Sequence, residues 1–204
     1  MYQEFLNHIN FSQTSFWISF ASITFNPLFW NIAARKEHKA RVISRFVGGN
    51  PYVGCYCLAL MIFSLGIIRD FLYKKAIEDQ PILHSLNNDY SKGLALVLFF
   101  SGNIFVLSSM YALGVTGTYL GDYFGILMSE RVTSFPFNVL DNPMYYGSSM
   151  VFLSTALWYA SPAGMILTIW AFVLYLIALR FEGPFTSMIY AQHEEKVKQL
   201  RKNE

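Results

Sequence analysis

Uncharged apolar stretches alternate with short polar connections along the chain. Residues 16–34, 52–68 and 93–114 contain no Asp, Glu, Lys or Arg. Each of these stretches is close to the length of about 20 residues that crosses a bilayer as a helix. The pattern predicts an all-α, polytopic integral membrane protein with four to five hydrophobic helical segments.

The last apolar stretch is too long for a single crossing. Residues 148–178 are uncharged, and 31 residues would form a helix of about 46 Å at about 1.5 Å per residue. A Ser-Pro-Ala-Gly sequence lies near the middle of the stretch, and Pro and Gly interrupt helices. We therefore predict two helices, 148–160 and 164–180, that form a C-terminal hairpin. Such a hairpin brings residues 180–182 to the membrane face that holds 142–145.

The distribution of cations favours the same topology. With the hairpin, one face carries 11 Lys and Arg residues and the other carries 4. Because cytoplasmic loops are rich in Lys and Arg, the positive face and the charged tail are predicted to be cytosolic.

The first apolar segment contains Asn26-Pro27, and Pro removes a backbone donor and kinks a helix. Residues 16–34 could therefore span the bilayer with a kink or re-enter one leaflet. Spanning is our prediction, because membrane helices tolerate Pro. The first ten residues lack the pattern of a cleavable signal peptide, so this segment is expected to stay in the membrane.

Composition agrees with a single membrane-embedded domain covering residues 1–204. Hydrophobic residues make up 54% of the chain and charged residues 14%, against about 25% charged in soluble domains. Mean hydropathy is +0.34. The net charge of +2 is too small to indicate nucleic acid as a partner. Cys55 and Cys57 are interpreted as small apolar fillers, and the four His residues lack the spacing of metal ligands.

The segment Gly117–Gly147 combines glycines, carboxylates, tyrosines and a proline turn between apolar helices. Loops held by a rigid scaffold often carry function, so this segment is the candidate site; the alternative is an interfacial loop with aromatic anchors. The candidate residues are those of this segment together with two that follow the hairpin: Asp122, Tyr123, Glu130, Arg131, Asp141, Asn142, Tyr145, Tyr146, Arg180 and Glu182.

Acids beside aromatic rings suit a cationic ligand, through charge pairing and cation–π contact. The alternative is that Asp122 and Glu182 are interfacial charges neutralised by Arg131 and Arg180.

Two groups of small residues would allow a neighbouring backbone or a ligand to approach a helix closely. Gly114, Gly117, Gly121 and Gly125 would share one side of any helix that they form. In the third segment, Ser101-Gly102-Asn103 indicates either close helix packing or a backbone opening for a ligand.

The stretch GTYLGDYFGILMSERVTSFPFNVLDNPMYYGS closely resembles the signature of the eukaryotic phospholipid N-methyltransferases. The stretches ITFNPLFWNIAARKEHK, VLSSMYALG and PFTSMIYA match the same family, and the resemblance covers nearly the whole chain. The stretch GGNPYVGCYCLALMIFSLGIIRD is more similar to the fungal enzymes of the last two methylation steps. The resemblance implies methylation of phosphatidyl-N-methylethanolamine and its dimethyl form, and of phosphatidylethanolamine as a further substrate, to phosphatidylcholine.

The resemblance also implies S-adenosylmethionine as the methyl donor, without a metal. Of the family's Gly-x-Gly donor motif, the second glycine falls on Gly102 and the first on Phe100, with Ser101 between them. Of its Glu-Glu pair, the first is Glu182 and the second position is Gly183. Similarity to isoprenylcysteine carboxyl methyltransferases adds three donor-binding candidates: Asn142, Pro143 and Tyr145.

The mechanism implied is in-line attack of a neutral lipid amine on the donor methyl group. Glu182 and Asp122 are the candidate catalytic carboxylates, which would accept or relay the amine proton. The candidate substrate-binding residues are Tyr123, Tyr146 and Arg131. The lipid tails would remain in the bilayer, so the site is expected to open laterally between helices.

Two other functions are compatible with the chain. A methyltransferase for a prenylated cysteine would need cationic partners for its anionic acceptor, and a non-catalytic lipid-binding paralogue would fail to bind the donor. The resemblance implies the endoplasmic reticulum membrane, with a mitochondrial membrane as a second location. The last four residues, Arg201 to Glu204, are similar to a basic retrieval signal. The sequence leaves the oligomeric state open.

Overall fold

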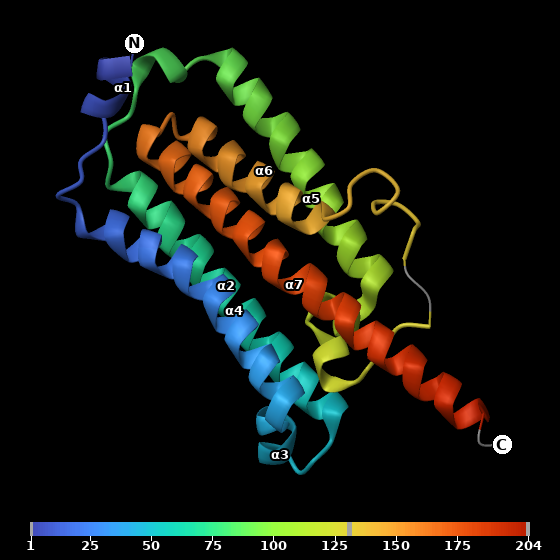
Figure 1. Ribbon diagram of the computed structural model, residues 1–204. Helices are drawn as coiled ribbons and strands as arrows, with labels where there is room; N and C mark the ends of the chain where they lie inside the picture. The colour runs from blue at the N-terminus through green and yellow to red at the C-terminus, as the bar shows by residue number, and fades with distance from the viewer. Residues whose placement is uncertain (1, 130–131, 203–204) are drawn as a thin grey trace.

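Five long helices run back and forth and form the body of the protein (Figure 1). The computed structural model describes residues 2–129 and 132–202. The long helices are α2 (Thr14–Ala40), α4 (Pro51–Glu78), α5 (Asp89–Thr118), α6 (Pro143–Trp158) and α7 (Pro162–Lys202). The short ones are α1 (Tyr2–Asn7), α3 (Val42–Phe46), η1 (His84–Leu86) and η2 (Gly121–Phe124). The part of the chain that the structure describes contains no strand, which confirms the all-α prediction.

In Figure 1, α7 lies in the centre of the bundle, with α6 and α5 on one side of it and α2 and α4, which cross in this view, on the other. Within residues 2–129 and 132–202, three helical stretches are long and apolar enough to cross a membrane: Pro51–Glu78, Asp89–Phe124 and Pro162–Leu200. Only 22% of the most apolar part of α4 and 17% of that of α5 is buried. Their remaining apolar side chains therefore face outward, as expected for a protein in lipid.

The first apolar segment forms one continuous helix, α2, which extends beyond the predicted bounds 16–34 at both ends. Its 27 residues continue through Pro27, which is buried, as is Asn26. A helix of this length extends about 40 Å, which is enough to span a bilayer. That α2 crosses the membrane stays a prediction.

Capping residues fix where two of the long helices, α4 and α5, begin. The Asn50 side chain accepts hydrogen bonds from the backbone N–H groups of Tyr52 and Val53, at 2.9 and 3.3 Å, before α4. Asn88 accepts from Ser91 N at 2.9 Å before α5. These side chains satisfy backbone donors that have no partner within the helix.

The C-terminal hairpin is confirmed. Helix α6 ends at Trp158, and α7 begins at Pro162, where the missing N–H of proline costs nothing. Between them Ala160 adopts a left-handed conformation with φ of 48°. The Ala160 carbonyl accepts from Leu83 N at 2.9 Å, which ties the turn to the connection between α4 and α5.

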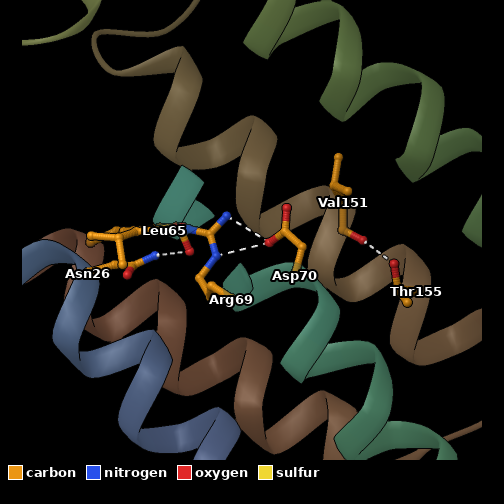
Figure 2. A network of polar contacts seen from close by, with 7 residues as sticks. Asn26, Leu65, Arg69, Asp70, Val151 and Thr155 are labelled. Carbon is orange, nitrogen blue, oxygen red and sulfur yellow. Dashed lines mark hydrogen bonds and ion pairs between the residues drawn. The ribbon is translucent and has the colours of Figure 1, made fainter. Parts of the chain in front are cut away.

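Helix α4 extends further than predicted, because Arg69 and Asp70 lie inside it and not at its end. Figure 2 shows the polar contacts of this region, in which Arg69 Nη2 and Asp70 Oδ1 are 2.8 Å apart. The guanidinium also donates to the Tyr175 hydroxyl at 2.8 Å and lies over the Phe152 ring at 4.9 Å. Because the charge is paired and hydrogen-bonded, the helix continues through it.

The membrane orientation of the hairpin can be tested by labelling. Asp141 and Pro184 are both exposed; Asp141 precedes the start of α6, and Pro184 lies inside α7, two residues after Glu182. In a background without Cys55 and Cys57, single cysteines at 141 and 184 should both react with an impermeant maleimide from the cytosolic side. Reaction from opposite sides would contradict the shared face.

Candidate functional site

Three helices meet at the carboxylate of Glu182, which lies on α7. Its Oε1 accepts hydrogen bonds from Trp30 Nε1 at 2.7 Å and from Asn31 Nδ2 at 2.9 Å, both on α2. Its Oε2 accepts from the Tyr145 hydroxyl of α6 at 2.6 Å. All three donors are neutral, and among the described residues no Lys or Arg forms an ion pair with Glu182. The carboxylate is therefore oriented by the protein without being neutralised by it.

The hairpin is what brings Tyr145 to Glu182. Tyr145 lies in the first turn of α6, which begins at the fully buried Pro143. Helix α7 returns alongside α6 and places Tyr175 against Tyr145, with ring centroids 5.0 Å apart. The predicted proximity of residues 142–145 and 180–182 follows from this packing.

The second candidate acid, Asp122, reaches the next turn of α7. It lies on η2, and its Oδ2 accepts a hydrogen bond from the Thr186 hydroxyl at 2.8 Å. The neighbouring Tyr123 is buried and stacks on Phe185, with centroids 5.0 Å apart and an interplanar angle of 14°. Glu182 and Thr186 are one helical turn apart, so the structure gathers both acids along one side of α7.

Beside them, η2 is held by an apolar cluster from α2, α4 and α7. Its buried members are Ala34, Cys55, Leu58, Tyr123, Phe124 and Ile189. Cys55 thus packs as a small apolar side chain, Cys57 is half-buried, and both are free thiols.

Gly114, Gly117, Gly121 and Gly125 do not lie along one side of a single helix. Gly114 has φ of +64° and ψ of −178° and interrupts α5, while Gly125 has φ of +80° and ends η2. Both conformations are accessible to glycine and strained for other residues. These glycines bend the chain, so that η2 turns back toward α7.

The α5 candidates lie on the other side of α6 from the acids. A Cβ on Gly102 would be 2.6 Å from the Gly147 carbonyl oxygen, and a Cβ on Gly147 would be 2.6 Å from that of Gly102. This is the close packing predicted as one alternative for Ser101-Gly102-Asn103. Ser101 is half-buried, whereas Phe100 is 62% exposed and contacts Phe99.

The remaining candidates differ in their surroundings. Asn142 is half-buried before α6, and Tyr146 contacts Phe172 with centroids 5.9 Å apart. No other described atom lies within 4 Å of the position of a Cβ on Gly183. Glu130 and Arg131 lie outside the described residues.

Sequence reasoning missed Trp30, Asn31 and Arg35 as site residues. They lie on α2, where Arg35 donates to the Phe181 carbonyl at 2.8 Å. The available signal was the FWN sequence at the end of an apolar segment, since Trp and Asn side chains shielded from water need partners for their N–H groups.

The described residues contain no group of three or more His, Cys, Asp or Glu side chains that could hold a metal ion. The chemical groups gathered here are two carboxylates, aromatic rings and neutral hydrogen-bond donors. Such a set can hold a cation and accept a proton from it.

Known proteins resemble this chain over nearly its full length. The family model described as phospholipid methyltransferase matches residues 90–193. Phosphatidyl-N-methylethanolamine N-methyltransferase of Neurospora crassa is 52% identical, over 95% of this chain and 90% of the relative. The Saccharomyces cerevisiae protein of the same name is 46% identical, over 97% and 96% of the two chains.

An animal relative shows the same extent of similarity. Phosphatidylethanolamine N-methyltransferase of Mus musculus is 47% identical, over 92% of this chain and 94% of the relative. No solved structure matches the chain. The relatives are methyltransferases, so a methyl donor and a phospholipid acceptor are implied for the site. With the matched segment containing η2, α6 and Glu182, the chain belongs to the phospholipid methyltransferase family.

Proposed function

We propose that this protein methylates the amine of phosphatidyl-N-methylethanolamine and its dimethyl form, giving phosphatidylcholine, with S-adenosylmethionine as donor. The names of the fungal relatives support the lipid, and the animal relative supports phosphatidylethanolamine as a further substrate. The observation that carries the proposal is the Glu182 carboxylate, oriented by three neutral donors where three helices meet.

The site fits the donor in charge and in hydrogen bonding. S-adenosylmethionine, when bound, supplies a methyl group on positively charged sulfur. Glu182 and Asp122 provide negative charge for such a cation, and no described Lys or Arg forms an ion pair with either acid. The buried Asn31 Oδ1 has no hydrogen-bond partner among the described residues, so it can accept from an N–H group of a ligand.

The protein's residues would act on the lipid amine in three ways. Glu182, with Asp122 as second candidate, accepts or relays the proton that the amine must lose. Tyr146, which is 37% exposed, offers an aromatic face to the quaternary ammonium product, whereas the Tyr123 ring is buried against Phe185 and supports the site from beneath. Tyr145 holds Glu182 in place. Asn142, Pro143, Gly183 and the α5 residues Phe100, Ser101 and Gly102 stay proposals for donor binding, as does Arg131 for the lipid.

We also propose the endoplasmic reticulum membrane as the location, from the family and the basic tail. A microsome assay with labelled donor and each of the three amine lipids tests the activity. Separated products should include phosphatidylcholine from both methylated precursors. Donor binding without any lipid product would favour another acceptor, and the absence of donor binding would favour a non-catalytic paralogue.

Tyr145→Phe should lower kcat by about five- to tenfold, because it removes one of three hydrogen bonds that orient Glu182. The ring and its packing against Tyr175 are retained. The matched control is Tyr159→Phe at the other end of α6, which should keep the wild-type kcat. A wild-type kcat for Tyr145→Phe would show that its hydroxyl does not position the acid.

A further inference from the structure

A groove open to the outside of the bundle runs between α2 and α7. Its first part has a volume of about 210 Å³, and its lining includes Leu28, Asn31, Ile32, Arg35, Ile177 and Phe181. Its second part, of about 330 Å³, is lined by Arg35, Arg180, Phe181, Pro184, Phe185 and Met188. Because Arg35 and Phe181 line both parts, the two hollows adjoin.

The first part is suited to a hydrocarbon chain. Leu28 is 54% exposed, Ile32 53% and Ile177 45%, so apolar side chains line the groove and face the bilayer. The volume is below the 300–1,000 Å³ typical of pockets that enclose a whole ligand. It can hold a portion of one acyl chain while the remainder of the lipid stays in the membrane.

The second part is suited to an anion. Among the described residues, no carboxylate lies within ion-pair distance of Arg35 or Arg180. The Arg35 guanidinium donates to the Phe181 carbonyl through Nη2 at 2.8 Å and lies over the Phe185 ring at 4.7 Å. These contacts fix the guanidinium and leave its other N–H groups available. A planar, preoriented guanidinium is well matched to the oxygens of a phosphate.

Both cations lie where the apolar helices become polar. Arg35 is the first charged residue after the uncharged stretch 16–34, and Arg180 is the first after 148–178. Lipid phosphates occupy this boundary between hydrocarbon and water. The apolar part of the groove then lies on the hydrocarbon side of the two cations.

We propose that this groove binds the phospholipid substrate, with its phosphate between Arg35 and Arg180 and one acyl chain along α2 and α7. Asn31 lines the groove and also donates to Glu182 at 2.9 Å. A lipid held in this way directs its amine, which is attached beyond the phosphate, toward the carboxylate. The inference rests on the proposed function and assigns the lateral opening to one pair of helices.

Arg180→Gln is the principal test, since Arg180 is exposed and its replacement leaves the packing intact. In mixed micelles of a sugar detergent, the KM for phosphatidyl-N-methylethanolamine should rise about tenfold, as expected for loss of one charged contact. The donor Kd and the kcat at saturating lipid should stay near wild type. Arg35→Gln should raise the lipid KM similarly, and Lys39→Gln, an exposed cation of α2 outside the groove, should not.

Photo-crosslinking tests the groove without catalysis. A phosphatidyl-N-methylethanolamine with a diazirine on one acyl chain should attach mainly to residues 28–32 and 174–178. Arg180→Gln should reduce this yield about tenfold at low lipid, again as loss of one charged contact. Equal labelling of outward-facing residues such as Leu60 and Leu107, without enrichment in the groove, would overturn the proposal.

The outcomes separate the groove from the reaction. A normal lipid KM for Arg180→Gln in an enzyme that makes phosphatidylcholine would overturn the groove and keep the proposed function. Groove labelling that depends on Arg180, in a protein that transfers no methyl group, would keep the groove and overturn the proposed function. A raised donor Kd with an unchanged lipid KM would assign the two cations to the donor's carboxylate and overturn the proposal.

Discussion

Glu182→Gln should lower kcat by about 10² to 10³, corresponding to about 2–4 kcal/mol, while the protein still folds and inserts. Glutamine has nearly the shape of glutamate, and its carbonyl oxygen can still accept from Trp30 and Asn31. Its amide can donate to the Tyr145 hydroxyl oxygen in place of accepting from it. The substitution therefore removes the charge and the proton acceptor while the contacts among α2, α6 and α7 remain.

The surroundings of Glu182 indicate that its negative charge, and not its shape, is what the reaction requires. A carboxylate at the end of an apolar stretch, as Glu182 is within α7, is costly unless it has partners or a task. Its hydrogen bonds come from neutral groups, so its negative charge remains available to a cation. The next residue is Gly183, so no adjacent acid can substitute for it.

Measurements of kcat, donor Kd and Tm on purified protein separate a catalytic role of Glu182 from a purely structural one. The matched control is Glu194→Gln, an exposed acid further along α7, which should leave all three unchanged. If Glu182 were only structural, its replacement would lower Tm and leave kcat near normal. Wild-type kcat and donor Kd would reject the assignment and make Asp122 the stronger candidate.

Gly102→Leu and Gly147→Leu should each destabilise the protein by about 3 kcal/mol, because no side chain fits where α5 and α6 cross. At each position a Cβ would lie 2.6 Å from the carbonyl oxygen of the other glycine. The helices must separate before either side chain can be accommodated. For a chain of this length, the change corresponds to a fall in Tm of roughly 10 °C.

The two substitutions report on one contact, so their effects should not add in the double variant. The control is Gly93→Leu on the same helix, where no described atom lies within 4 Å of an added Cβ. A raised donor Kd for Gly102→Leu with an unchanged Tm would contradict the packing role. That result would support the donor contact that the family resemblance implies.

The elements of this protein could be predicted from its sequence because their signals are local. Uncharged stretches of helical length marked α2, α4, α5 and the hairpin, and Pro162 marked the break between its helices. A stretch of 31 apolar residues exceeds one crossing, whatever packs against it. The same local reasoning ended α4 too early at Arg69, because the Tyr175 and Phe152 contacts of that cation come from other helices.

Which side chains form the candidate site depended on tertiary structure more than the helices did. The acids, tyrosines and family motifs could be identified along the chain, but Trp30 and Glu182 are 152 positions apart. No periodicity indicates which side chains of two distant helices will meet, since that depends on where and at what angle the helices cross. The packing of α7 against α2 and against α6 determines it here.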